Sequence, residues 1–224
     1  MEEQDNTTSI ECPNCGFDIN TQIITTIRSQ DLALEELFNG SLNNCICDQC
    51  SADFIFETPL VFKSDNQDYF IYYNQGIAEL GWKKAQEQMQ MALDASLEGI
   101  DIHERPECRL TLNRNDFIEK IALHLADLDD KLIEYLKFHI FSKESELNPQ
   151  AHLLLYDFSR SDHEIIEFNV LDTKTGELLH NTQTPVATLM QLENLLGQDD
   201  CPIELDTLFS GLYVQLDRLT QHNG

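Results

Sequence analysis

The chain has 224 residues, 42% of them hydrophobic, and carries 40 acidic against 14 basic residues, a net charge of -26. This length and apolar content suffice for one large domain or two smaller ones. The charge argues against a nucleic-acid partner, because contact with phosphates needs clustered Lys and Arg. No stretch approaches the ~20 apolar residues of a membrane helix, and no secretory signal precedes the first strand. We therefore expect a cytoplasmic globular protein that binds neither nucleic acid nor membrane.

The first 58 residues predict a small β module with one inserted helix. Apolar and β-branched residues predict four strands, at residues 10–11, 19–27, 42–46 and 54–56. A helix that starts at Asp31 and ends at Gly40 lies between the second and third strands. Eleven acidic residues and one basic residue, Arg28, fall within residues 1–58. The module is therefore expected to present an acidic surface of its own.

Two Cys-x-x-Cys pairs, Cys12 with Cys15 and Cys47 with Cys50, carry the strongest chemical signal in this module. A two-residue gap lets both thiolates of a pair bind one tetrahedral ion. The odd total of seven cysteines also fits a reducing compartment better than a disulfide framework. Cys45 competes with Cys47 as a ligand but lacks the required spacing to Cys50. We predict that Cys12, Cys15, Cys47 and Cys50 bind one structural Zn²⁺ that stabilises the fold and catalyses nothing.

Residues 59–146 predict a β-hairpin followed by helices. The hairpin strands are expected at 60–62 and 69–73, and a further short strand at 109–112. Helical spacing predicts a helix over 82–97 and an αα-hairpin whose helices start near Asn113 and Asp129. We interpret the aromatic strand at 69–73 as part of the core, because aromatic residues on paired strands are more often buried against neighbouring side chains than used to bind ligands.

The sequence resembles the CpXC-domain proteins of bacteria and archaea. The resemblance covers roughly residues 10–140 and rests on the segments Cys12–Gly16, Cys47–Cys50 and Glu119–Lys137. It implies a zinc-binding N-terminal module fused to an α/β body. The family is functionally uncharacterised, so the resemblance supplies no catalytic residues.

The second cysteine pair departs from the family motif in two places. Asp48 stands where the motif has proline, and Ser51 stands where glycine would ease the turn. In the first pair, Pro13 pre-sets φ and Gly16 tolerates a left-handed backbone. Neither departure removes a sulfur ligand, but both are expected to loosen the second half of the site.

The C-terminal part predicts a smaller antiparallel α+β unit. Pro149, within a polar segment, places a boundary near residue 147. Three antiparallel strands are expected at residues 153–156, 165–170 and 177–180, followed by a helix from Pro185 to Gly197. Residues 205–219 fit either helix or strand. The complete prediction is an α+β chain with a zinc-binding domain at 10–146, made of a zinc ribbon (10–58) and a body (59–146), and a second domain at 147–224 packed on it.

Known catalytic motifs are missing from the sequence. It contains no glycine-rich phosphate loop, no Gly-x-Ser-x-Gly and no His-Glu-x-x-His. Two pairs, His103 with Cys108 and His124 with Asp127, could form a second site, although scattered histidines are more often surface or core residues. Cys108 and Cys201 are interpreted as buried apolar residues. We therefore assign no catalytic residue.

Three functions remain open at this stage. The first is a non-enzymatic, zinc-stabilised interaction module whose acidic surface binds a protein partner. If the negative charge steers association, that partner is basic. The second is an enzyme of unknown reaction with a cleft between the two parts, which buried carboxylates or histidines converging away from the zinc would support. The third is a nucleic-acid-binding zinc ribbon, which the charge disfavours. The sequence identifies neither the partner nor the oligomeric state.

Overall fold

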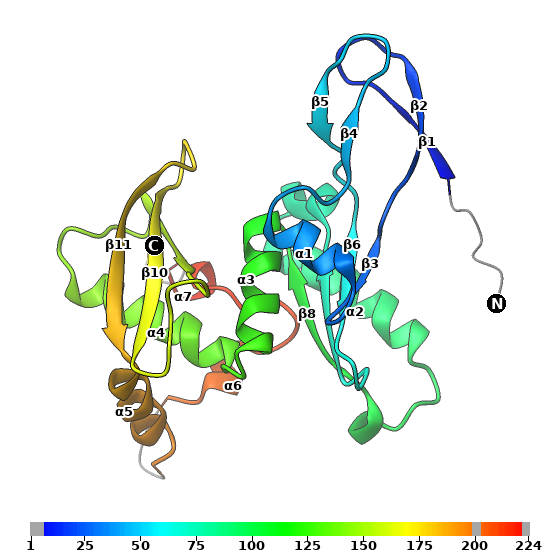
Figure 1. Ribbon diagram of the computed structural model, residues 1–224. Helices are drawn as coiled ribbons and strands as arrows, with labels where there is room; N and C mark the ends of the chain where they lie inside the picture. The colour runs from blue at the N-terminus through cyan, green and yellow to red at the C-terminus, as the bar shows by residue number, and fades with distance from the viewer. Residues whose placement is uncertain (1–6, 199–202, 221–224) are drawn as a thin grey trace.

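The computed structural model describes residues 7–198 and 203–220 and has an α+β fold (Figure 1). Two β-hairpins project together from one end of the molecule. Strand β1 (Thr7–Glu11) pairs with β2 (Asp18–Gln22), and β4 (Asn44–Ile46) pairs with β5 (Asp53–Ile55), both antiparallel. We call these two hairpins, residues 7–22 and 44–55, the arm, and the remaining described residues the body. The turn of each hairpin carries one cysteine pair.

The single strand predicted over residues 19–27 is wrong, because the chain breaks it into two strands of different sheets. Strand β2 ends at Gln22, and β3 (Thr26–Arg28) belongs to a sheet in the body. Between them, the Asn43 side chain accepts a hydrogen bond from the Ile24 N–H and donates one to the Ile24 carbonyl, both at 2.9 Å. This side chain occupies the backbone groups of Ile24 that a continuous strand would pair with a neighbour.

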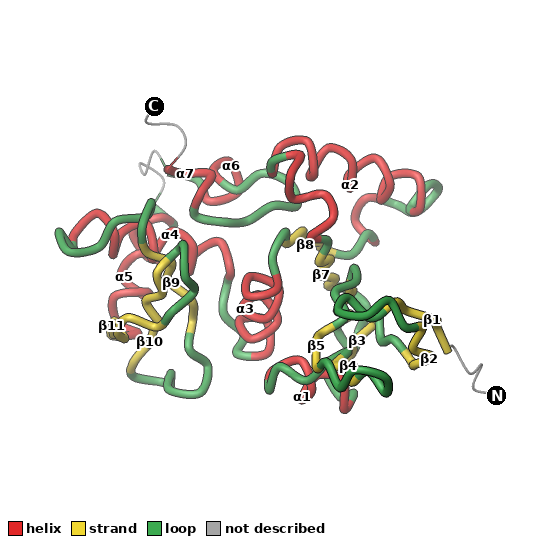
Figure 2. The backbone as a smooth tube through the Cα atoms, turned by 90° about the horizontal axis from the view of Figure 1, so that it is seen from above, coloured by secondary structure: helices red, strands yellow, loops and turns green. Residues whose placement is uncertain are grey.

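A four-stranded mixed sheet forms the centre of the body. Its order is β3, β6, β7 and β8, with the middle pair antiparallel and the outer pairs parallel. Helices α1 and α3 cover one face and α2 covers the other (Figure 2). The bounds of these elements are α1 Leu32–Phe38, β6 Leu60–Lys63, β7 Tyr69–Tyr73, α2 Trp82–Ser96, β8 Glu107–Thr111 and α3 Arg114–Leu125, with 3-10 turns at Gln75–Leu80 and Ile102–Glu104.

The aromatic strand β7 is part of the core, as predicted. Ile71 and Tyr73 are buried against α1 and α3, whereas Phe70 and Tyr72 pack on the opposite face with residues of α2. This alternation is what a strand covered on both faces requires. The hairpin β6–β7 and the helix α2 are likewise confirmed.

Helix α3 lies between the central sheet and a second, three-stranded antiparallel sheet. The second sheet has the order β11, β10, β9 and shares a core with α3, α4 and α5. This confirms the three strands and the helix expected after Pro185. The bounds are α4 Asp130–Lys143, β9 His152–Tyr156, β10 Ile165–Asp172, β11 Leu178–Pro185, α5 Val186–Leu196, α6 Leu205–Leu208 and α7 Asp217–Thr220.

The C-terminal segment resolves the ambiguity over residues 205–219. It forms the short helices α6 and α7 with a non-helical run between them, and this run crosses the body where the Leu110 N–H donates to the Leu212 carbonyl at 2.8 Å. The domain boundary near residue 147 stays a prediction. Among the described residues, no helix has the length and apolar character needed to cross a membrane.

Candidate functional site

The two hairpin turns of the arm bring four cysteine sulfurs together. The Sγ atoms of Cys12 and Cys50 are 3.7 Å apart, and those of Cys15 and Cys47 are 3.6 Å apart. All four sulfurs lie within 4.8 Å of one another. Cys12 and Cys47 are buried, whereas Cys15 is exposed. These separations are far longer than a disulfide bond, so the four cysteines form a cluster that could bind a metal ion.

The two turns of the cluster have the same backbone hydrogen bonds. In the first, the Cys12 N–H donates to the Phe17 carbonyl and the Gly16 N–H donates to the Cys12 carbonyl, both at 2.9 Å. In the second, the Cys47 N–H donates to Ala52 at 2.9 Å, and the Ser51 N–H donates to Cys47 at 2.8 Å. The two halves are therefore equivalent in conformation despite their different sequences.

Ser51 is in a backbone conformation that suits glycine better. Its φ is 56°, and the equivalent Gly16 has a φ of 72°. A residue with a Cβ atom pays a steric cost in this left-handed region. The departure noted in the sequence thus produces a strained residue in an otherwise equivalent turn.

We expect Ser51→Gly to stabilise the metal-bound arm by about 0.5–1 kcal/mol, because glycine relieves the left-handed strain. The measurement is the concentration of a competing chelator that removes half of the metal, which should rise a fewfold. Gly16→Ser is the matched reverse change and should lower that concentration, since its Cβ would also lie 3.3 Å from a Glu11 carboxylate oxygen. If the chelator concentration changed equally for both variants, Ser51 would not be strained.

The thiols of the cluster differ in acidity. The Asn14 side-chain amide, 3.5 Å from the Cys50 sulfur, is the largest cause that lowers the pKa of Cys50 to about 6. At Cys15 a backbone hydrogen bond from Phe17 lowers the pKa, but loss of solvent around the sulfur atom and the three neighbouring sulfurs raise it to about 12. A metal ion binds thiolates, so metal binding at this cluster must release protons.

The remaining cysteines lie outside the cluster. Cys45 is buried in β4, where its thiol donates to the Asn43 carbonyl at 3.5 Å and burial raises its pKa. Cys108 is buried in β8, and burial raises its pKa to about 11. His103 is exposed in a 3-10 turn and pairs with no described cysteine. Cys201 lies outside the described residues.

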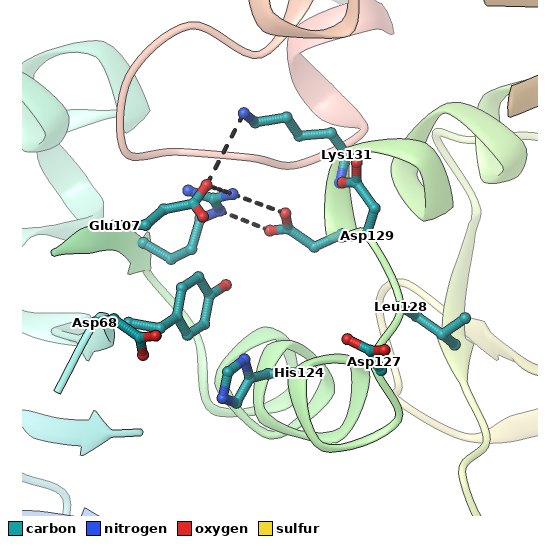
Figure 3. A pocket seen from close by; sticks show the side chains of 10 residues that line it. Asp68, Glu107, His124, Asp127, Leu128, Asp129 and Lys131 are labelled. Atoms are coloured by element: carbon teal, nitrogen blue, oxygen red, sulfur yellow. Dashed lines mark hydrogen bonds and ion pairs between the residues drawn. The ribbon is translucent and has the colours of Figure 1, made fainter. Parts of the chain in front are cut away.

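The second pair singled out from the sequence, His124 and Asp127, lines a pocket of about 470 Å³ beside the link between α3 and α4 (Figure 3). The His124 ring stacks on Tyr69 at 4.6 Å. Within the part of the chain that the structure describes, no hydrogen bond or ion pair joins His124 to Asp127. The Arg109 guanidinium, which also lines this pocket, binds both carboxylate oxygens of Asp130 at 2.8 and 2.9 Å. The pocket therefore holds a structural ion pair, and no acid–base pair forms between its histidine and Asp127.

A buried chain of charged residues runs from Arg109 into the interface of α3 and α4. Lys120 contacts Asp130 at 3.2 Å and Glu134 at 3.3 Å. Lys137 contacts Glu134 at 2.9 Å and Glu119 at 2.7 Å. We call these residues, together with Arg109, the charge network.

The charge network also binds backbone from later in the chain. Glu119 accepts a hydrogen bond from the Tyr156 N–H at 2.6 Å, and Glu134 accepts one from the Leu216 N–H at 2.9 Å. Burial raises the pKa of both Asp130 and Glu134, but neighbouring cations outweigh it and hold the two values below their usual range. Sequence reasoning missed this network, although charged residues at helical spacing on α3 and α4 were a signal for it.

Asp116, at the start of α3, is buried without an ion pair among the described residues. Its burial, and then the nearby Glu119 carboxylate, raise its pKa to about 7. Such a carboxyl favours the folded state below about pH 4, and this contribution is lost as the pH rises to about 7, because the unfolded state ionises first.

We expect the free energy of unfolding of Asp116→Asn to exceed that of the parent protein by about 2 kcal/mol above neutral pH. At about pH 4 we expect no such gain. The amide keeps the oxygen that accepts a hydrogen bond from Asn113 at 2.6 Å. Urea unfolding of both proteins across this pH range measures the difference. A difference that does not change with pH would contradict the raised pKa.

Comparison with known proteins agrees with the geometry of the cluster. Residues 10–137 match the family described as CpXC protein, and this match covers more than half of the chain. The chain therefore belongs to the CpXC protein family, which confirms the resemblance inferred from the cysteine pairs. No curated protein and no solved structure was found to match it.

Proposed function

We propose that the cysteine cluster binds one structural Zn²⁺. Four sulfurs placed ~2.3 Å from one ion stand ~3.8 Å apart in a tetrahedral site, and the pairs at 3.6 and 3.7 Å fit that arrangement. Four thiolates favour zinc or iron over harder cations. A closed set of four protein ligands leaves no position for a substrate, which supports a structural role.

Elemental analysis of the purified chain tests the identity of the metal. We expect about one zinc per chain, with far less in Cys12→Ser. Cys45→Ser is the control, because its sulfur is two residues from the cluster but outside it, and it should retain the metal. Iron in place of zinc, or metal retained by Cys12→Ser, would contradict the assignment.

The arm is the part of the chain that a metal at the cluster would stabilise. Few of its side chains are buried, and the described core clusters are built elsewhere in the chain. Its surface carries four exposed carboxylates, on Glu11, Asp18, Asp48 and Asp53, and its residues 7–22 and 44–55 contain no Lys or Arg. The large apolar side chains Phe17, Ile46 and Ile55 are exposed on the same hairpins.

We propose that the protein is a non-enzymatic interaction module and that the arm binds a basic protein partner. The observation that carries this proposal is the combination of exposed carboxylates and exposed apolar side chains on an arm without basic residues. Apolar side chains supply contact area, and the carboxylates steer a basic partner and repel acidic ones. The same charge disfavours nucleic acid, and the odd number of cysteines, four of them in two Cys-x-x-Cys pairs, supports a cytoplasmic location.

The test compares two sets of charge reversals in affinity purification from the native host. The arm variant carries Asp18→Lys, Asp48→Lys and Asp53→Lys. The control carries three reversals at exposed acids of the C-terminal part, Glu164→Lys, Glu177→Lys and Glu193→Lys. We expect the parent and the control to retain a basic partner at low salt and the arm variant to lose it. Equal retention by all three proteins, or a gel shift with nucleic acid, would contradict the proposal.

The buried carboxylates do not favour the alternative function, an enzyme. Buried carboxylates do converge away from the cysteines, an arrangement named above as support for that alternative. However, the cations and backbone amides that bind Glu119, Asp130 and Glu134 account for them as structural groups.

A further inference from the structure

The charge network has as many cations as buried carboxylates, three of each. Its three cations bind Glu119, Asp130 and Glu134, each within 3.3 Å. Two further carboxylates lie beside it, on Asp116 and Asp217. The structure describes no ion pair for either of them. Asp116 accepts a hydrogen bond from the Asn113 amide at 2.6 Å, and Asp217 accepts one from the Tyr213 hydroxyl at 3.2 Å.

These two carboxylates line the same cavity. It has a volume of about 200 Å³ and lies among α3, α4, β9 and the C-terminal segment, whose helix α7 is close to α4 in Figure 1. Asp116, Glu134 and Asp217 contribute three carboxylates to its wall. Lys137 contributes an ammonium group that Glu119 and Glu134 already share. The wall therefore has more carboxylates than cations, and its one ammonium group is already paired.

The wall also contains buried polar atoms without a partner. Among the described side chains, Nε2 of Gln215 and Oδ1 of Asp217 are buried and make no hydrogen bond. Gln215 is only 7% exposed and lines the cavity. A buried amide N–H group without an acceptor and a buried carboxylate oxygen without a donor each cost free energy. Together they call for a molecule that supplies one acceptor and one or more donors.

We propose that this cavity binds a small primary ammonium ion that carries an oxygen acceptor, as an amino alcohol does. The ammonium group would donate to Asp217 and Asp116, and the oxygen would accept from the Gln215 amide. The cavity holds a molecule of only a few heavy atoms, so a long polyamine does not fit inside it. This site lies in the body, away from the arm, and is independent of the proposed partner binding.

Bound ammonium should change the acidity of both carboxyls. Burial raises the pKa of Asp217 to about 6, with the Glu134 carboxylate adding to it and the Tyr213 hydroxyl and Arg218 opposing it. Asp116, at about 7, faces Glu119 and Glu134, which raise its pKa, and Lys137 and Lys120, which lower it. His152 of β9 also lines the cavity, with Nδ1 accepting from the Asn148 N–H. A bound cation lowers both pKa values, so binding should release protons near neutral pH.

Calorimetric titration of the full chain with ethanolamine tests the proposal. We expect saturable binding, at least about tenfold tighter at about pH 8 than at about pH 5. Buffers of different ionisation enthalpy should report proton release between these limits. Asp217→Asn and Gln215→Leu should each weaken binding. Glu164→Gln, at an exposed acid that does not line the cavity, should not change it.

Carboxyl NMR titration of the parent protein supplies a readout that needs no variant. Ethanolamine should lower the pKa of Asp116 and Asp217 and leave that of the exposed Glu164 unchanged. The proposal is overturned if ethanolamine produces neither saturable heat nor these shifts. It is also overturned if potassium chloride at the same concentration produces them equally, which would indicate an inorganic cation or general screening.

Discussion

Replacing Cys12 with serine is expected to release the metal and unfold the arm while the body stays folded. A structural zinc site contributes on the order of 10 kcal/mol to the fold that it holds, and the arm has few buried apolar side chains to replace that contribution. The body has its own cores around two sheets. The effect should therefore be large in one part of the chain and small in the other.

Hydrogen exchange measured along the chain tests this division. The Cys47 N–H, bonded to Ala52 in the parent protein, should lose its protection in Cys12→Ser. The amides of the central sheet, such as that of Leu110, should keep theirs. Cys45→Ser should leave both regions unchanged. Loss of protection throughout the chain would show that the body depends on the metal, and full protection of the arm would show that the metal is dispensable.

Lys137→Met is expected to destabilise the whole fold by about 3–5 kcal/mol, the usual cost of removing one partner from a buried ion pair. Lys137 is 2% exposed and is the cation shared by Glu119 and Glu134. Its removal leaves the Glu119 carboxylate with the Tyr156 backbone amide as its remaining hydrogen-bond partner among the described residues. Urea unfolding followed by circular dichroism measures the loss.

The same helix offers a matched control. Lys143 lies in the last turn of α4 and is exposed, so Lys143→Met should change stability by less than about 0.5 kcal/mol. If Lys137→Met costs no more than Lys143→Met, the charge network does not hold α3 and α4 together in the way its geometry indicates.

Local patterns in the sequence predicted the parts of the structure that local interactions determine. The spacing of Cys12 with Cys15 and of Cys47 with Cys50 predicted the cluster that the two hairpin turns form. Asp129 was expected at the start of a helix, and its side chain accepts hydrogen bonds from the first turn of α4. That the cysteines bind zinc stays a prediction.

Contacts between distant residues decided the rest. Residues 19–27 read as one strand because β-branched residues favour strands, but Asn43, nineteen positions beyond Ile24, holds the chain between β2 and β3. Lys137 pairs with Glu119, eighteen positions before it on α3, and no local pattern indicates that pair. The side chain of Asp31 was expected to cap α1, yet it accepts from the Arg28 N–H instead. A single sequence does not show which distant residue will compete for a group.

The charge network has partners beyond the residues that match the family. The family match stops at residue 137, inside α4. Yet the carboxylates of that helix and of α3 bind the backbone at Tyr156 and Leu216, and the apolar face of α4 packs against β9, β10 and α5. Residues beyond the shared family segment thus complete the interior of the segment itself. In this chain, Glu119 and Glu134 lie inside the matched residues and have hydrogen-bond partners outside them.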